Sequence, residues 1–216
     1  MPSAEEFLAE LDKRNAAALD RIGVACGKEP DAAVTVPALL LLALKNEIEA
    51  TECAAAWIAT TPEVDVKLAL ARQAGDEAKH FRLIQKRLAE LGTDASGFDP
   101  GAASPMLSYL LTLRSTVERV AAGQFTREAL AVVRNVEFVR FCEARGDEAT
   151  AALYRDVIQP DERHHHELGR SLLAKLAGGA EAQAAARAAS DQTLKLAEEL
   201  QEIARMKKGI SRAPGC

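Results

Sequence analysis

Histidine is rare in this chain, and its spacing from acidic residues gives the clearest chemical signal in the sequence. The chain contains only four histidines, His80, His164, His165 and His166. Two Glu-x-x-His patterns occur, Glu77 with His80 and Glu162 with His165, and an Asp precedes each Glu. Residues three apart on a helix share one face, so each pair can direct a carboxylate and an imidazole at one metal ion. The duplicated pattern predicts two similar halves of one metal site.

A centre for two metal ions needs one further carboxylate from each of two partner helices. In an antiparallel helical hairpin, residues that face each other are about equally distant from the turn. A turn at Pro62 therefore places Glu47 opposite Glu77. The glycine turn between the third and fourth long helices places Glu128 opposite Glu162 in the same way. The expected ligand set is Glu47, Glu77, His80, Glu128, Glu162 and His165.

Other acidic residues on the same helices fit these positions less well. Glu49 is close in height to Glu47 but lies on a different side of the helix. Glu52 and Glu137 lie nearer the turns than the site does. We therefore expect Glu49 and Glu137 to be solvated surface charges.

The residues around the two motifs suggest which ring binds and what supports it. Adjacent helical residues point about 100° apart, so only one of three consecutive histidines can share the direction of Glu162. We expect this to be His165, with His166 as the rival at the four-residue spacing. Asp76 and Asp161 are candidates to accept the second ring N–H of a ligand histidine in the opposite half. The alternative for both is a role in surface charge or salt bridges.

The donor atoms of this set predict the kind of metal. Four carboxylates would neutralise the charge of two divalent ions, and two neutral imidazoles would complete the ligands. Oxygen and nitrogen donors suit iron or manganese better than a closed structural zinc site, which favours cysteine. We expect two iron ions at ~3.5–4 Å separation, with manganese as the alternative.

Helical periodicity and capping signals predict an all-α chain around this site. Capping boxes at Ser3 and Ser115 begin two helices, and Thr61 before Pro62 is expected to cap another. Four long helices would form two antiparallel hairpins joined by a long crossover between the second and third helices. Their expected ranges are about 36–60, 63–91, 116–144 and 148–176. Accessory helices at about 3–26 and 181–206 would pack on this four-helix core, at about 36–176, in a single domain of residues 1–216.

Composition excludes some function classes. The net charge of −5 does not point to nucleic acid as a partner, and no apolar run approaches the ~20 residues of a membrane span. The N-terminus lacks the basic and apolar regions of a signal peptide. The four cysteines, Cys26, Cys53, Cys142 and Cys216, show no paired spacing and fit small side chains in a reducing compartment. Cytoplasm is the expected location.

At the doubled motif the chain resembles the ferritin-like di-iron carboxylate superfamily, whose pattern is Glu followed by Glu-x-x-His, twice. The resemblance covers about residues 36–176 and extends to small members such as the tRNA-modifying hydroxylases and rubrerythrin-like proteins. It implies a ferritin-like bundle and a di-iron centre. Two departures argue against a typical rubrerythrin. There is no Cys-x-x-Cys module, and Phe125 occupies the place of an additional Glu before Glu128.

Three classes of function remain in competition. The leading hypothesis is an O₂-dependent di-iron oxidase or hydroxylase that acts on a small organic substrate with an external electron donor. The alternative is iron handling, either as a ferroxidase or as a peroxide-consuming protein. The third is a metal-stabilised interaction module without turnover. A homodimer is an open question for each.

Small and apolar residues near the motifs favour the first hypothesis. Gly169 lies one turn beyond His165, where the other half has Ile84, and this asymmetry is expected to open space on one side of the metals. Apolar side chains would line the metals or belong to the core of the bundle. They are Leu44, Phe125, Val132 and Ile158.

Overall fold

Two antiparallel helical hairpins form the body of the molecule. The computed structural model describes residues 2–27, 33–210 and 213–215, and every regular element in these ranges is a helix. The first hairpin consists of α2 (Val36–Thr60) and α3 (Val64–Glu90). The second has one arm of α5 (Thr116–Val120), η1 (Ala121–Arg127) and α6 (Glu128–Glu143), and another of α7 (Glu148–Leu153), η2 (Tyr154–Ile158) and α8 (Gln159–Leu176). The predicted all-helical class is confirmed for the described residues.

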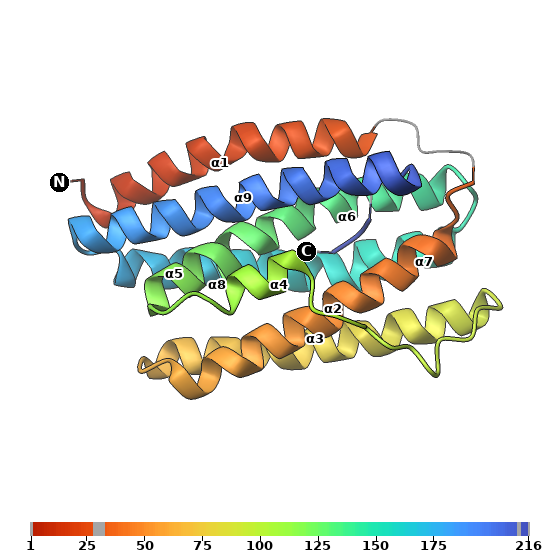
Figure 1. Cartoon of the computed structure of the whole chain (residues 1–216), viewed down its shortest axis with the longest axis horizontal. Coiled ribbons are helices and arrows are strands. Elements are labelled where there is room, and N and C mark those ends of the chain that lie inside the picture. Colours follow the sequence, from red (N-terminus) through yellow and green to blue (C-terminus); the bar gives the residue numbers. More distant parts are fainter. Residues whose placement is uncertain (1, 28–32, 211–212, 216) are drawn as a thin grey trace.

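A long connection joins the two hairpins. It contains the short helix α4 (Pro105–Leu110) and runs from the end of α3 back along the molecule to the start of α5 (Figure 1). The side chain of Ser104 caps α4 by accepting the N–H of Leu107. The predicted capping box at Ser115 and Glu118 then begins α5. The second hairpin therefore starts at the same end of the molecule as the turn between α2 and α3.

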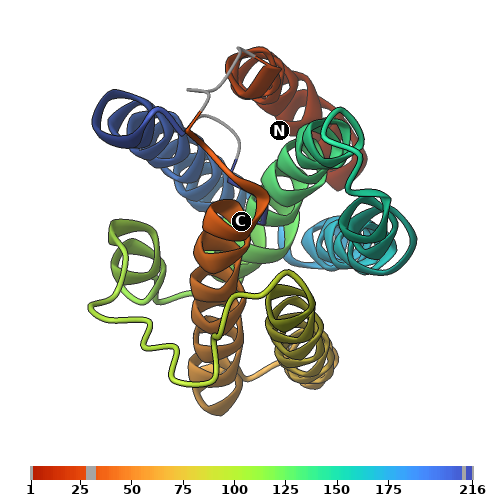
Figure 2. The ribbon, with the colours of Figure 1, turned by 90° about the vertical axis from the view of Figure 1, so that its right-hand side faces the viewer.

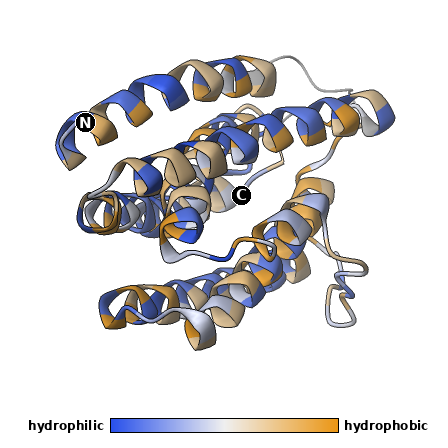
Figure 3. Cartoon of the chain, turned by 60° about the vertical axis from the view of Figure 1, so that its left-hand side comes forward, coloured by the Kyte–Doolittle hydropathy of each residue, from blue (hydrophilic) through white to orange (hydrophobic). Residues whose placement is uncertain are grey.

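The first and last helices lie side by side over the second hairpin. They are α1 (Ala4–Gly27) and α9 (Ala180–Lys208), close to the predicted ranges (Figures 1 and 2). Both contact η1 or α6. Surface ion pairs such as Arg14 with Asp191 and Arg21 with Glu198 join the two helices. Figure 3 shows hydrophilic and hydrophobic stretches on both, as expected for helices with one buried face.

Two local features differ from what the sequence indicated. The helices expected at 116–144 and 148–176 each contain a π-helical segment, η1 and η2. Thr61 does not cap α3; it ends α2, and Glu63 precedes α3 without a side-chain cap. Thr61 instead accepts a hydrogen bond from buried Arg119. None of the helices in the described part of the chain is long and apolar enough to cross a bilayer.

The apolar core is divided into two clusters along the bundle. One contains Trp57, Leu70 and Leu173, and the other contains Leu44 and Ile84. On α2, α3 and α8 the predicted metal ligands lie between the residues of these two clusters. A polar layer therefore interrupts the core at the level of the two Glu-x-x-His motifs. Three cysteines are buried outside this layer or at its border, Cys26, Cys53 and Cys142, while Cys216 lies outside the described residues.

Candidate metal centre

All six side chains predicted as ligands lie in one buried cluster. One comes from α2, two from α3, one from the first position of α6 and two from α8. None of the six is more than 2% exposed. They are Glu47, Glu77, His80, Glu128, Glu162 and His165. The turn-distance argument therefore selected residues that the fold brings together, although whether they bind metal stays a prediction.

The cluster consists of two overlapping groups of four residues. Glu77 and Glu162 belong to both groups. Glu47 and His80 complete the first, and Glu128 and His165 complete the second. Within each group, one candidate ligand atom from every residue lies within 4.8 Å of the others. Two shared carboxylates between two unshared pairs is an arrangement that can hold two adjacent cations.

Each histidine turns the same ring nitrogen, Nδ1, toward the carboxylates. His80 Nδ1 lies 3.2 Å from Glu77 Oε2 and 3.5 Å from Glu47 Oε2. His165 Nδ1 lies 3.6 Å from Glu77 Oε1 and 3.7 Å from Glu128 Oε2. Both imidazoles therefore direct one nitrogen into the space that the carboxylates surround.

The other ring nitrogen of each histidine is held from the opposite half of the site. Asp161 Oδ2 lies 3.1 Å from His80 Nε2, and Asp76 Oδ2 lies 3.1 Å from His165 Nε2. A carboxylate can only accept, so Nε2–H must donate, and this leaves Nδ1 as the ligand atom. The predicted cross-pairing of the two Asp residues is present in the structure.

The two Asp residues also pair with cations at the surface. Lys79 Nζ lies 2.7 Å from Asp161 Oδ2, and Arg72 Nε lies 3.3 Å from Asp76 Oδ2. The salt-bridge role that the sequence left as an alternative therefore accompanies the supporting role. Arg72 precedes Asp76 by four residues, a spacing from which the sequence could have indicated this ion pair. Nothing in the sequence linked Lys79 to Asp161.

In the absence of metal, raised pKa values favour protonation of several side chains in the cluster. Burial raises the pKa of Glu47 to about 8, and burial with the charge of Glu77 raises the pKa of Glu162 well above its ordinary value. Burial opposes protonation of His80, but hydrogen bonds to Glu47 and Glu77 outweigh it and raise the pKa of His80 to about 11. Burial also opposes protonation of His165, but the neighbouring carboxylates, Glu128 first, outweigh it and raise the pKa of His165 to about 9. Cations that entered the cluster would displace these protons.

Several buried ligand atoms have no hydrogen-bond partner among the described residues. They are Glu47 Oε1, Glu77 Oε1, both carboxylate oxygens of Glu162, and His165 Nδ1. Unsatisfied buried polar atoms are costly and rare, so five in one cluster fit a place for a bound group. A pair of divalent cations fits this set of donors.

A π-helical turn precedes each ligand carboxylate of the second hairpin. The N–H of Glu128 donates to Gly123 O, and the N–H of Gln159 donates to Tyr154 O, each five residues back. A π turn adds about one residue relative to an α-helix. Counted from the hairpin loop, η1 lies beyond Glu128, so only η2, between the loop and Glu162, falls within the counted stretches. The single extra residue of η2 is within the one- or two-residue precision of a turn centre, so the count still selected Glu128.

Neighbouring polar residues divide between support of the site and structural roles. Gln73 lies beside the cluster, where its Nε2 donates to Glu128 Oε1 over 2.5 Å. His166 lies outside both groups; its Nδ1 is 2.7 Å from Phe125 O and its ring stacks on Phe125.

Glu49 was expected at the surface, but it is 5% exposed.

The expected opening beside Gly169 is absent. A Cβ at Gly169 would lie 2.6 Å from Gln124 C and 2.8 Å from Phe125 N, so the backbone of η1 packs directly on this glycine. Gly169 is therefore a close contact between α8 and η1 rather than the mouth of a substrate pocket. Leu44, Phe125 and Ile158 are buried within the two apolar clusters, and Val132 is only half-buried.

The C-terminal segment is a neighbour of the site that the sequence did not indicate. The N–H of Gly215 donates to Asn135 Oδ1 over 2.8 Å, and Asn46 Nδ2 donates to Pro214 O over 2.9 Å. A Cβ at Gly215 would lie 3.5 Å from Glu47 Oε1. No periodic pattern could have placed this irregular segment against α2.

Removal of the Asp161 charge is expected to weaken metal binding by about 10–100-fold. In Asp161→Asn the His80 ring loses its charged acceptor, so Nδ1 is a poorer donor and the ring is less well oriented. The loss should concern the ion nearest His80 first. Competition titration with a coloured chelator measures the affinity, and Asp156→Asn, an exposed change on the same arm, is the control. Equal affinities of Asp161→Asn and the control would contradict the role of Asp161.

Comparison with known proteins adds no family assignment to this geometry. No family model, curated protein or solved structure matches the chain. The function must therefore be argued from the arrangement of the residues themselves.

Proposed function

We propose that this protein is a ferritin-like di-iron carboxylate protein that reduces O₂ and oxidises a small organic substrate. The observation that carries the proposal is the pair of overlapping four-residue groups that share Glu77 and Glu162. Four long helices supply these ligands from two hairpins joined by a long crossover, which is the connection expected of a ferritin-like bundle. The order of ligands along the chain supports the same proposal.

The donor set favours iron over zinc. Both groups contain three carboxylates and one imidazole, and neither contains a cysteine. The nearest candidate thiol on α2, Cys53, is buried, and burial raises its pKa to about 12. Hard and intermediate donors of this kind suit Fe(II) and Mn(II). Manganese is the alternative, and elemental analysis of the purified protein distinguishes the two metals.

The chain's own residues would prepare the site for this chemistry. Asp161 and Asp76 orient the two imidazoles, and Gln73 fixes one oxygen of Glu128. The apolar clusters on both sides exclude bulk water from the carboxylates. Two bound iron ions would supply the electrons for O₂ reduction, and an external donor would restore them.

Rapid mixing of anaerobically prepared ferrous protein with O₂ tests the proposal. We expect rapid oxidation that reaches its limit at two iron ions per chain, because the cluster offers two groups of ligands. The control is protein that received zinc in place of iron, which should consume no O₂. Continued oxidation of excess ferrous iron, with growth of a ferric mineral, would instead support iron handling, and absence of any O₂ reaction would refute the proposal.

A further inference from the structure

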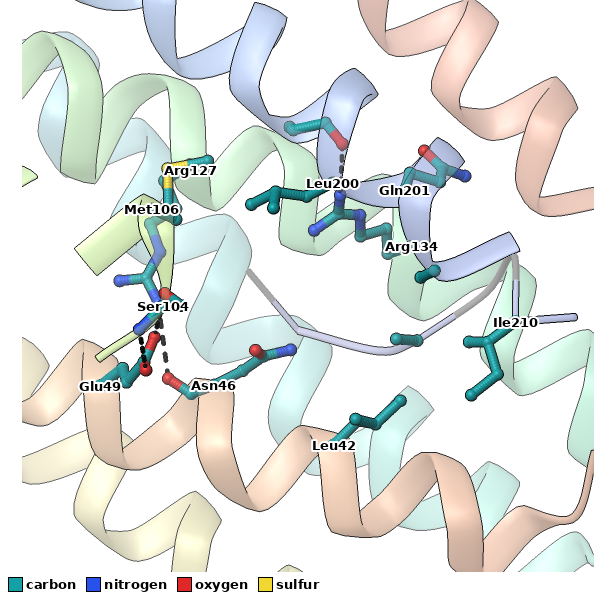
Figure 4. A pocket seen from close by; sticks show the side chains of 13 residues that line it. Leu42, Asn46, Glu49, Ser104, Met106, Arg127, Arg134, Leu200, Gln201 and Ile210 are labelled. Atoms are coloured by element: carbon teal, nitrogen blue, oxygen red, sulfur yellow. Dashed lines mark hydrogen bonds between the residues drawn. The ribbon is translucent and has the colours of Figure 1, made fainter. Parts of the chain in front are cut away.

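One side of the candidate metal centre is covered by irregular backbone rather than by a helix. The cover is the C-terminal segment, residues 213–215, which hydrogen-bonds to both α2 and α6. Figure 4 shows the space between these helices, with Asn46 of α2 on one side and Arg134 of α6 on the other. The last two residues of the segment are buried there, and Glu47 beneath them is 2% exposed.

Two hydrogen bonds hold this segment, one to each neighbouring helix. Asn46 Nδ2 on α2 donates to Pro214 O over 2.9 Å, and the N–H of Gly215 donates to Asn135 Oδ1 on α6 over 2.8 Å. No other hydrogen bond of the segment occurs within the described part of the chain. A segment held by so few contacts opens at a lower free energy than a packed helix.

Gly215 covers a candidate ligand without bonding to it. A Cβ at Gly215 would lie 3.5 Å from Glu47 Oε1 and 3.4 Å from Asn46 Cβ. Glu47 Oε1 has no hydrogen-bond partner among the described residues. The φ angle of Gly215 is 79°, a conformation that glycine adopts without strain. The segment can therefore leave Glu47 without breaking a bond to this carboxylate.

The other sides of the centre are closed by parts that cannot move without disturbing the ligands. Asp161 and Asp76 hold the rings of His80 and His165, and the two apolar clusters lie on either side along the bundle. Beside the C-terminal segment, in contrast, there is room for movement. Ala213 borders a cavity of about 180 Å³ between α2, α6 and α9.

We propose that residues 213–215 form a strap that moves away from Glu47 to admit or release a metal ion and then closes over the site. These residues include no His, Cys, Asp or Glu side chain that could serve as a ligand. Opening of the strap therefore changes the rates of metal entry and release alike and leaves the affinity nearly unchanged. The cover over Glu47 exists in the metal-free fold, whereas its role in metal exchange rests on the metal binding of the proposed function.

A reversible tether tests the role in metal exchange. Asn46→Cys with Gly215→Cys places two thiols at positions whose Cβ atoms lie 3.4 Å apart, close to the ~3.5–4.5 Å of disulfides. Cys216→Ser is the common background, so that no neighbouring thiol competes. With the tether oxidised, uptake and release of Co(II), followed by absorbance, should each be slower by about tenfold or more than after its reduction. The ratio of the two rates should stay nearly constant, and Asn46→Cys alone should not respond to oxidation.

Alkylation of the metal-free protein tests the cover itself. A thiol introduced by Glu47→Cys should react with iodoacetamide about tenfold faster, or more, in a chain that ends at Arg212 than in the full chain. The matched control is Glu49→Cys on the same helix, because Ser104 rather than the strap contacts that position. Its rate should be the same in both chain lengths. Peptide mass spectrometry distinguishes the introduced thiols from the chain's own cysteines.

The outcomes separate the strap from the proposed function. Equal exchange rates in the oxidised and reduced tether, or equal alkylation at position 47 in the two chain lengths, would overturn the proposal. Faster alkylation at both positions 47 and 49 in the shorter chain would show general loosening and would overturn it as well. Protection of position 47 by the strap in a protein that takes up no metal would support the cover and refute the proposed function.

Discussion

Glu162→Gln is expected to empty both metal sites at once. Glu162 belongs to both four-residue groups, so its replacement removes a charged ligand from each. Metal content should fall from two ions per chain to none, with an affinity loss of at least about 100-fold. The metal-free fold should tolerate the change well, because burial keeps the pKa of Glu162 well above its usual value and glutamine mimics the neutral carboxyl group. Elemental analysis and thermal unfolding with and without metal measure both effects.

Changes at unshared residues separate this account from a general loss of structure. Glu47→Gln affects only the group with His80 and should leave one ion per chain. Glu49→Gln alters a buried carboxylate two residues away, outside both groups, and should retain two ions. The same metal content in Glu162→Gln and Glu49→Gln would show that Glu162 is not a shared ligand.

Gly169→Ala is expected to destabilise the fold and distort half of the site. Its added methyl group would lie 2.6 and 2.7 Å from Gln124 C and O, and backbone atoms cannot move aside as a flexible side chain can. Overpacking of this kind costs about 1–3 kcal/mol of unfolding free energy. Because η1 ends directly before Glu128, the displacement should also weaken the ion at His165. Urea unfolding measures the first effect and metal titration the second.

Gly75→Ala provides the matched control. Gly75 also lies within a helix that carries ligands, but apart from its chain neighbours and its own helix backbone no atom lies within 4 Å of a Cβ built on it. Alanine should stabilise the protein there by about 0.5–1 kcal/mol, since glycine loses more conformational freedom in a helix. If Gly169→Ala were as stable as Gly75→Ala, the close contact between α8 and η1 would be incorrect.

The sequence predicted the ligand cluster because the information was local and periodic. Two Glu-x-x-His motifs identify helix faces, and equal distance from a turn identifies the residues opposite them, Glu47 and Glu128. The π turns did not spoil this count, because η1 lies beyond Glu128 as counted from the loop and η2 adds only about one residue before Glu162. Each Asp contacts the histidine of the opposite half. This cross-pairing was expected because Asp76 and Asp161 occupy equivalent places in the repeat.

What the sequence could not predict depends on contacts between distant segments. Glu49 was expected in solvent, but the loop before α4 brings Ser104 onto it. Gly169 was expected to open space, and only the path of η1 shows that the glycine permits close packing. The position of Gly215 against Glu47 arises from an irregular segment without periodicity.

Anomalous diffraction at the iron edge, from crystals of protein purified with iron, tests the central claim most directly. We expect two peaks per chain, ~3.5–4 Å apart. One should lie near Glu47 and His80 and the other near Glu128 and His165, with Glu162 between them. A single peak, or peaks away from these residues in protein that contains less than one metal ion per chain, would contradict the account.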